Sequence, residues 1–139
     1  MISAKTWRKI QQDFKWRCAY CQMLAIYLPQ GLQKDHIVPL SAGGEDVAKN
    51  ICPACPNCNA HKADKISALD PASGQLTSLF NPSRQKWHDH FGWDKSGTKI
   101  IGRTAIGRAA VIALKMNLPT IIAWRKIIAK IGGYPPQDL

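Results

Sequence analysis

Apolar residues recur every three or four positions in three stretches of the chain, which predicts three amphipathic helices. The first covers residues 3–16, with Ser3 or Thr6 as its N-cap. The second begins after a Thr104 cap and runs to about residue 117, and the third begins at Pro119 or Thr120 and runs to residue 131. Their apolar positions are Trp7, Ile10 and Phe14, then Ile106, Ala109, Ala110, Ala113 and Leu114, and then Ile121, Trp124, Ile127, Ile128 and Ile131.

The middle of the chain predicts shorter elements. Residues 26–40 predict extended pieces around a turn at Pro29-Gln30-Gly31, and residues 41–49 predict a loop. An extended segment resumes at Ile51, and residues 58–66 suit a short helix. We expect residues 70–98 to form an irregular layer held by the rings of Phe80, Trp87, Phe91 and Trp93.

Composition narrows the class of protein. The 139 residues are 45% hydrophobic, which excludes a disordered chain, and no apolar run reaches the roughly 18 residues of a membrane span. Charges throughout residues 1–17 argue against a secretory signal. Five cysteines in such a chain favour metal or redox chemistry over disulfides, so we expect a reducing, cytoplasmic location. We find no repeat or linker and expect one α+β domain over residues 1–139.

The net charge of +10 is concentrated at the two ends of the chain. Residues 1–34 carry six basic and one acidic side chain, and residues 84–139 carry ten and three. Residues 35–83 carry three basic and five acidic side chains. Such a balance suits a polyanion or an anionic membrane as partner. Because no basic amphipathic helix has a clean aromatic face, we expect a nucleic acid, gripped by basic flanks around a cation site.

The cysteines predict a zinc site. Cys18-x-x-Cys21 and Cys55-x-x-Cys58 are two pairs at the spacing that lets both thiolates face one tetrahedral ion. Cys52-x-x-Cys55 has the same spacing, so spacing alone does not decide which two of these three bind metal. Cys52 follows Ile51 in an expected strand and suits a buried thiol. We therefore favour Cys55 and Cys58 as ligands.

Between the two pairs lies the string DHIVPLSAGG at residues 35–44. On a strand, the adjacent Asp35 and His36 point to opposite faces, so a carboxylate and an imidazole can serve different roles. Asn50 follows fourteen residues after His36, and Asn59 nine residues after that.

At these residues the sequence resembles the HNH endonuclease family. The matching elements are CAYC at 18–21, DHIVPLSAGG, Asn50, and Cys55-x-x-Cys58-Asn59-x-x-Lys62, in order. The later strings LFNPSRQKWHDHFGW, GRTAIGRAAV and YPP look like those of small stand-alone bacterial HNH proteins. The resemblance implies a ββα-metal core over residues 18–66, in which zinc clamps a hairpin to a helix, followed by a basic helical extension over about 84–139.

The resemblance also implies residue roles. His36 matches the general base that activates water, and Asn50 matches the residue that ties the loop and orients His36. Asp35 and Asn59 match ligands of a catalytic divalent cation, and their oxygen donors suit Mg²⁺. The expected reaction is DNA phosphodiester hydrolysis that leaves a 5′-phosphate and a 3′-hydroxyl. Many members have His where this chain has Asn59, which affects the ion preference.

Other polar residues are open to two interpretations. We interpret His61 as an exposed helix residue rather than a ligand, and the His88–His90 segment as aromatic packing with one buried imidazole. Lys62 suits a phosphate contact or a solvated surface equally. Arg103 and Arg108 flank Gly102 and Gly107, where backbone can approach phosphate, although solvated arginines are commoner near a helix start.

Two functions from different classes fit these observations. One is a metal-dependent endonuclease that cuts duplex DNA, with a structural zinc and a Mg²⁺-type ion. The other is a zinc-stabilised nucleic-acid-binding module that does not cut. A binding module needs the cysteines and the basic flanks but has no use for Asp35, His36 and Asn59 together. The sequence therefore favours the enzyme.

Overall fold

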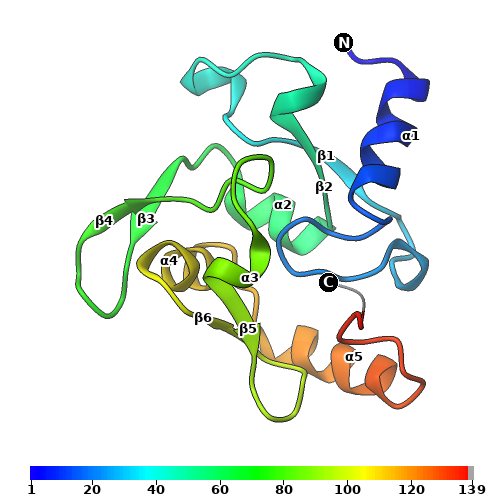
Figure 1. The fold of residues 1–139 in the computed structure, drawn as a ribbon, viewed down its shortest axis with the longest axis vertical. Helices are drawn as coiled ribbons and strands as arrows, with labels where there is room; N and C mark the ends of the chain where they lie inside the picture. Colours follow the sequence, from blue (N-terminus) through cyan, green and yellow to red (C-terminus); the bar gives the residue numbers. More distant parts are fainter. Residues whose placement is uncertain (138–139) are drawn as a thin grey trace.

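The computed structural model describes residues 1–137 and shows a mixed α+β fold (Figure 1). The helices are α1 (Ala4–Asp13), α2 (Pro56–Lys62), α3 (Trp87–His90), α4 (Ala105–Ala113) and α5 (Pro119–Ala129). Short 3-10 helices are η1 (Ala25–Tyr27), η2 (Leu40–Ala42) and η3 (Ala48–Asn50). The strands are β1 (Gln33–His36), β2 (Ile51–Ala54), β3 (Ser67–Leu69), β4 (Leu76–Ser78), β5 (Phe91–Trp93) and β6 (Ile100–Gly102). They form three antiparallel pairs, β1–β2, β3–β4 and β5–β6.

The three predicted long helices are present as α1, α4 and α5. The Ser3 side chain accepts a hydrogen bond from the Thr6 N–H at 3.1 Å, so Ser3 is the N-cap of α1. The Thr104 hydroxyl accepts one from the Gly107 N–H at 3.1 Å and caps α4. Both helices end earlier than predicted, because Lys15 and Lys115 have positive φ values of 56° and 47°, which turn the chain out of the helix.

The expected irregular layer over residues 70–98 is wrong in part, since β4, α3 and β5 lie within it. Each of these elements has only three or four residues, which is too short for a hydrophobic period to be visible in the sequence. The aromatic packing is confirmed. The ring of Trp87 stacks on Phe91 with centroids 5.2 Å apart and lies 4.6 Å from Trp93.

The C-terminal helices and the first cysteine pair share one cluster of buried side chains. The Trp87 Nε1–H donates to the Tyr20 carbonyl at 2.7 Å, and the Tyr134 hydroxyl donates to the Cys21 carbonyl at 2.9 Å. The fully buried Arg125 donates to backbone carbonyls in the segments before and after α4. These bonds hold the C-terminal half against the segment that carries Cys18 and Cys21. Over residues 1–137, no helix has the length and apolar character needed to cross a membrane.

Candidate active site and metal centre

Four cysteine side chains meet in the interior from two segments of the chain. Cys18 and Cys21 lie in the turn after α1, while Cys55 is the N-cap of α2 and Cys58 lies in its first turn. Their Sγ atoms all lie within 4.8 Å of one another, and all four residues are buried. A tetrahedral zinc ion is bound by four thiolates at this mutual spacing, so the cluster could hold a structural zinc. The cluster contains Cys55 and Cys58 and does not include Cys52.

Local backbone geometry prepares both pairs for a shared ligand. The Cys21 N–H points at the Cys18 Sγ and the Cys58 N–H at the Cys55 Sγ, each at 3.4 Å. Pro56 occupies the first turn of α2, where its fixed φ favours the helical start. Hydrogen bonds from the other thiols, that of Cys18 above all, hold the pKa of Cys21 well below its usual value. The hydrogen bonds with Cys18 raise the pKa values of Cys55 and Cys58 well above the usual value, so within the metal-free cluster the thiolate, the form that binds metal, is favoured at Cys21.

Cys52 lies outside the cluster, on β2, and is fully buried. Its Sγ contacts the Tyr20 hydroxyl at 3.6 Å and the Asp35 Oδ2 at 3.7 Å. Burial raises the pKa of Cys52 well above the usual value, and the nearby Asp35 carboxylate raises it further. Cys52 therefore acts as a neutral packing thiol.

His36 is the last residue of β1 and is partly open to solvent, with 28% of its side chain exposed. Asp35, one residue earlier, is 4% exposed, so the predicted opposite orientation of the two side chains is confirmed. The His36 Nε2 lies 2.9 Å from the Asp46 Oδ1. This hydrogen bond lowers the pKa of Asp46, so its carboxylate is ionised and only accepts. In the neutral imidazole, Nε2 then carries the proton and Nδ1 is free to accept one.

Sequence reasoning missed Asp46. The loop that carries it also carries Glu45, and no spacing rule separates these two neighbouring acids. Only the path of the loop brings the carboxylate of Asp46, rather than that of Glu45, to the ring of His36.

The loop between β1 and β2 is closed by the side chain of Asn50. Its Oδ1 accepts from the Val38 N–H at 2.9 Å, and its Nδ2 donates to the carbonyls of Val38 and Glu45 at 2.9 and 2.8 Å. Gly43 adopts a φ of 88°, and a Cβ on Gly44 would lie 1.8 Å from the Val38 carbonyl oxygen. The Gly-Gly sequence thus permits the tight path that Asn50 holds, directly after His36.

Asp35 lies in a buried polar network between β1 and α2. Its Oδ1 accepts from the Lys62 Nζ at 3.1 Å, and its Oδ2 accepts from the Tyr20 hydroxyl at 2.6 Å. The Lys62 Nζ also donates to the His36 carbonyl at 3.0 Å, and Lys62 is 1% exposed. The ammonium of Lys62 therefore faces a carboxylate in the interior, and this placement does not support a phosphate contact.

Asn59 lies on α2, with its Nδ2 donating to the Gln33 Oε1 at 2.8 Å. The carboxylate of Asp35 and the amide of Asn59 are hard oxygen donors of the kind that Mg²⁺ accepts. In this arrangement, however, both Asp35 oxygens are hydrogen-bonded and shielded, and each residue has its own protein partner. The two residues fit a cation by donor type but do not form an open site here.

The remaining candidates lie elsewhere. The Arg108 guanidinium binds both oxygens of Asp70 at 2.8 and 3.0 Å, and Arg103 lies against Gly92, so neither is placed beside His36. The His61 Nδ1 contacts the Asn57 carbonyl at 2.9 Å, which makes it a half-buried helix residue. His88 and His90 pack on Trp87 and Phe80, as expected, but neither imidazole is buried.

This geometry combines a four-cysteine cluster with a hairpin that ends in a histidine paired with a carboxylate. Residues 18–65 match the family model described as HNH endonuclease, and this segment is accordingly an HNH endonuclease family domain with a four-cysteine cluster. No curated protein and no solved structure matches the chain.

Proposed function

We propose that this protein is an endonuclease that hydrolyses phosphodiester bonds of duplex DNA. Family membership of residues 18–65 implies nuclease activity and a nucleic-acid substrate. The observation that carries the proposal is the pairing of His36 with Asp46 at the solvent-facing end of β1.

In this proposal, His36 is the general base. Ionised Asp46 holds the Nε2–H, so the ring is fixed in one tautomer and Nδ1 accepts the proton of the attacking water. An imidazole nitrogen can accept a proton from water and later release it, which suits this task. Asn50 fixes the loop after His36 through its three hydrogen bonds and thereby limits the motion of the hairpin end.

We assign the divalent cation that the family typically uses to Asp35 and Asn59. Such an ion supplies charge stabilisation at the phosphate when it is bound. Because the Lys62 ammonium is hydrogen-bonded to the Asp35 carboxylate, an ion can bind Asp35 only after that hydrogen bond breaks. The assignment is tested by Mn²⁺ binding measured by electron paramagnetic resonance. Unchanged binding in Asp35→Asn would refute it.

We assign the structural zinc to Cys18, Cys21, Cys55 and Cys58. The cluster joins the turn after α1 to the start of α2, so a bound ion would fix α2 relative to the segment that packs on the C-terminal half. The α2 helix carries both Asn59 and Lys62. Zinc would therefore stabilise the position of the candidate cation site without taking part in the reaction.

A plasmid-nicking assay tests the enzymatic proposal. Wild-type protein with Mg²⁺ or Mn²⁺ should convert supercoiled plasmid to nicked or linear DNA, and His36→Ala should lose this activity. His88→Ala is the matched control, because His88 is an exposed histidine that packs on Trp87 away from β1. Equal cutting by wild type and His36→Ala would exclude His36 as the base.

A zinc-stabilised DNA-binding module that does not cut is the second candidate. The closed Asp35–Lys62 pair favours it, because a carboxylate neutralised by a buried lysine has no free oxygen for an ion. The same assay separates the two functions. DNA binding without cutting at any divalent cation would support the module and refute the enzyme.

A further inference from the structure

The segment between β4 and α3 forms a fixed turn against the candidate active-site loop. The carbonyl of Asn81 accepts from the N–H groups of Arg84 and Gln85, at 3.2 and 2.9 Å. The Asn81 Oδ1 accepts from the Ser83 N–H at 3.0 Å, and the Gln85 Oε1 accepts from the Asn81 N–H at 2.8 Å. Residues 81–85 thus have a defined shape that is set by their own hydrogen bonds.

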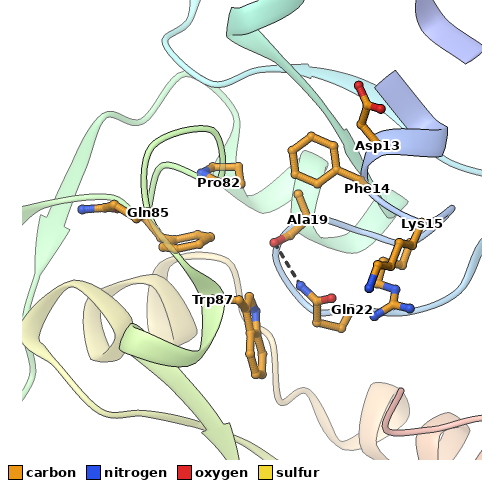
Figure 2. A pocket seen from close by; sticks show the side chains of 10 residues that line it. Asp13, Phe14, Lys15, Ala19, Gln22, Pro82, Gln85 and Trp87 are labelled. Atoms are coloured by element: carbon orange, nitrogen blue, oxygen red, sulfur yellow. Dashed lines mark hydrogen bonds between the residues drawn. The ribbon is translucent and has the colours of Figure 1, made fainter. Parts of the chain in front are cut away.

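The turn borders two hollows. Figure 2 shows Pro82, Gln85 and Trp87 on one side of a cleft, with Phe14 and Ala19 from the end of α1 and the turn after it on the other. Through Asn81, Ser83 and Arg84, the turn also borders a hollow of about 390 Å³ whose other wall is the loop between β1 and β2. The turn therefore lies between α1 and the loop that follows His36.

Two cations from distant parts of the sequence line this hollow. Arg84 lies on the turn, and Lys49 lies on η3, next to Asn50. Both are exposed, and within residues 1–137 neither side chain has a hydrogen-bond or ion-pair partner. Val38, two residues after His36, lies in the same wall. Glu45 is the acidic residue of the hollow, and its side chain has no partner in the described part of the chain either.

Free guanidinium and ammonium groups beside a rigid wall suit phosphate. A guanidinium binds phosphate through two parallel N–H bonds, and a lysine acts as a point charge. In complexes with DNA, contacts to phosphate set the register of the protein on the strand. Lys62, Arg103 and Arg108 are either neutralised or not placed at this site, and the N-terminal ammonium is paired with Asp46 at 2.9 Å. Lys49 and Arg84, by contrast, are unpaired cations that the fold of residues 1–137 brings to the His36 loop.

We propose that the hollow between residues 43–50 and residues 81–84 binds the sugar–phosphate backbone of duplex DNA next to the bond that is cut, with Arg84 and Lys49 contacting phosphates. The proposal rests on the nuclease function above, and it assigns a role to the NPSR string at residues 81–84. Glu45 opposes the bound strand by charge repulsion.

Binding is measured by fluorescence anisotropy with a labelled 16-base-pair duplex, in the His36→Ala background without added divalent cations. Arg84→Gln should raise the Kd about 5- to 10-fold, and Lys49→Gln about 3-fold, since each removes one phosphate contact. Each should lower the slope of log K against log salt by about 0.9. Glu45→Gln should lower the Kd about 2-fold or more, because a charge that repels the strand is removed.

Lys126→Gln is the matched control. Lys126 is an exposed cation on α5, which lies at the far end of the molecule from β1 and β2 (Figure 1). The Kd of the Lys126→Gln variant should stay within about 2-fold of that of the His36→Ala protein, because a single distant charge is screened at physiological salt. Melting temperatures of the Arg84 and Lys49 variants should stay within about 2 °C, since these exposed side chains have no partner to lose.

The outcomes separate this proposal from the nuclease function. Equal weakening by Arg84→Gln, Lys49→Gln and Lys126→Gln would show that only diffuse net charge matters and would refute DNA binding in the hollow. Unchanged binding in Arg84→Gln, with His36→Ala unable to nick plasmid, would also refute DNA binding in the hollow but would leave the nuclease function supported. Weakened binding in Arg84→Gln, with no cutting by wild type, would support DNA binding in the hollow and refute the nuclease function.

Discussion

The buried pair of Lys62 and Asp35 can be tested by replacing Lys62 with Met, which keeps a long apolar side chain and removes the ammonium. In the wild type, the Lys62 Nζ donates to the Asp35 Oδ1 at 3.1 Å and to the His36 carbonyl at 3.0 Å. The side chains are 1% and 4% exposed, so water does not replace the lost donor. After the substitution, the Asp35 carboxylate stays in the interior with only Tyr20 and Cys52 as donors.

Breaking a buried pair by removing one partner costs about 3–5 kcal/mol, because the other charge is left uncompensated. A chain of this length loses about 3–4 °C of melting temperature per kcal/mol, so Lys62→Met should melt about 10–20 °C below the wild type. Adding Asp35→Asn should restore most of this loss, because replacing both members of a buried pair is nearly neutral. Circular dichroism melts at pH 7 measure both effects.

Lys65→Met is the control for replacing a lysine with methionine, since Lys65 lies just after α2, is exposed, and its ammonium donates to the His61 carbonyl and to no carboxylate within residues 1–137. It should melt within about 2 °C of the wild type. The reasoning is refuted if Lys62→Met melts like the wild type but binds DNA more weakly. That result would mean that the ammonium of Lys62 serves a phosphate and not Asp35.

Three further predictions concern the metal centre and the packing of α4. Cys58→Ser should abolish bound zinc and lower the melting temperature by ~10 °C or more, because structural zinc contributes directly to folding; Cys52→Ser should retain one zinc per chain by atomic emission. Gly107→Ala should destabilise the protein by about 2–4 kcal/mol in urea titrations, since its Cβ would lie 1.9 Å from the His90 carbonyl oxygen; a neutral effect would contradict the packing of α4. In the Asp70→Asn variant, the free energy of unfolding should fall less steeply with decreasing pH below about pH 4 than it does in the wild type. Arg108 holds the pKa of Asp70 well below its usual range, so that stability is present at neutral pH and is lost as Asp70 is protonated. An unchanged acid profile would refute this role.

Patterns confined to neighbouring residues predicted the larger elements and the metal cluster. Periodic apolar positions predicted α1, α4 and α5, because a long helix repeats its buried face several times. The spacing of the cysteines, together with the expected strand at Ile51, selected Cys55 and Cys58 over Cys52. Elements of three or four residues, such as β4 and β5, were not predicted, because their stability comes from a partner strand and not from their own pattern.

The polar contacts around the candidate site were less predictable from the residues. The resemblance selected Asp35 and His36, and strand alternation correctly separated their two faces. It did not identify Asp46 as the partner of His36, nor the pairing of Lys62 with Asp35 across β1 and α2. Each contact joins residues that are ten or more positions apart through a loop or a helix packing, and no local rule specifies that geometry.

The sequence by itself determined the family of residues 18–65, the two cysteine pairs that form the cluster, the long helices and the basic character of the two flanks. These features depend on residue types at short spacing, where covalent geometry limits the choices. Only the tertiary structure decided which charges are available. It buries Lys62 against Asp35, pairs Arg108 with Asp70, and leaves Arg84 and Lys49 free beside the loop of His36. The reason is physical: whether a cation can meet a phosphate depends on its burial and on its nearest carboxylate, and both are set by how distant segments pack.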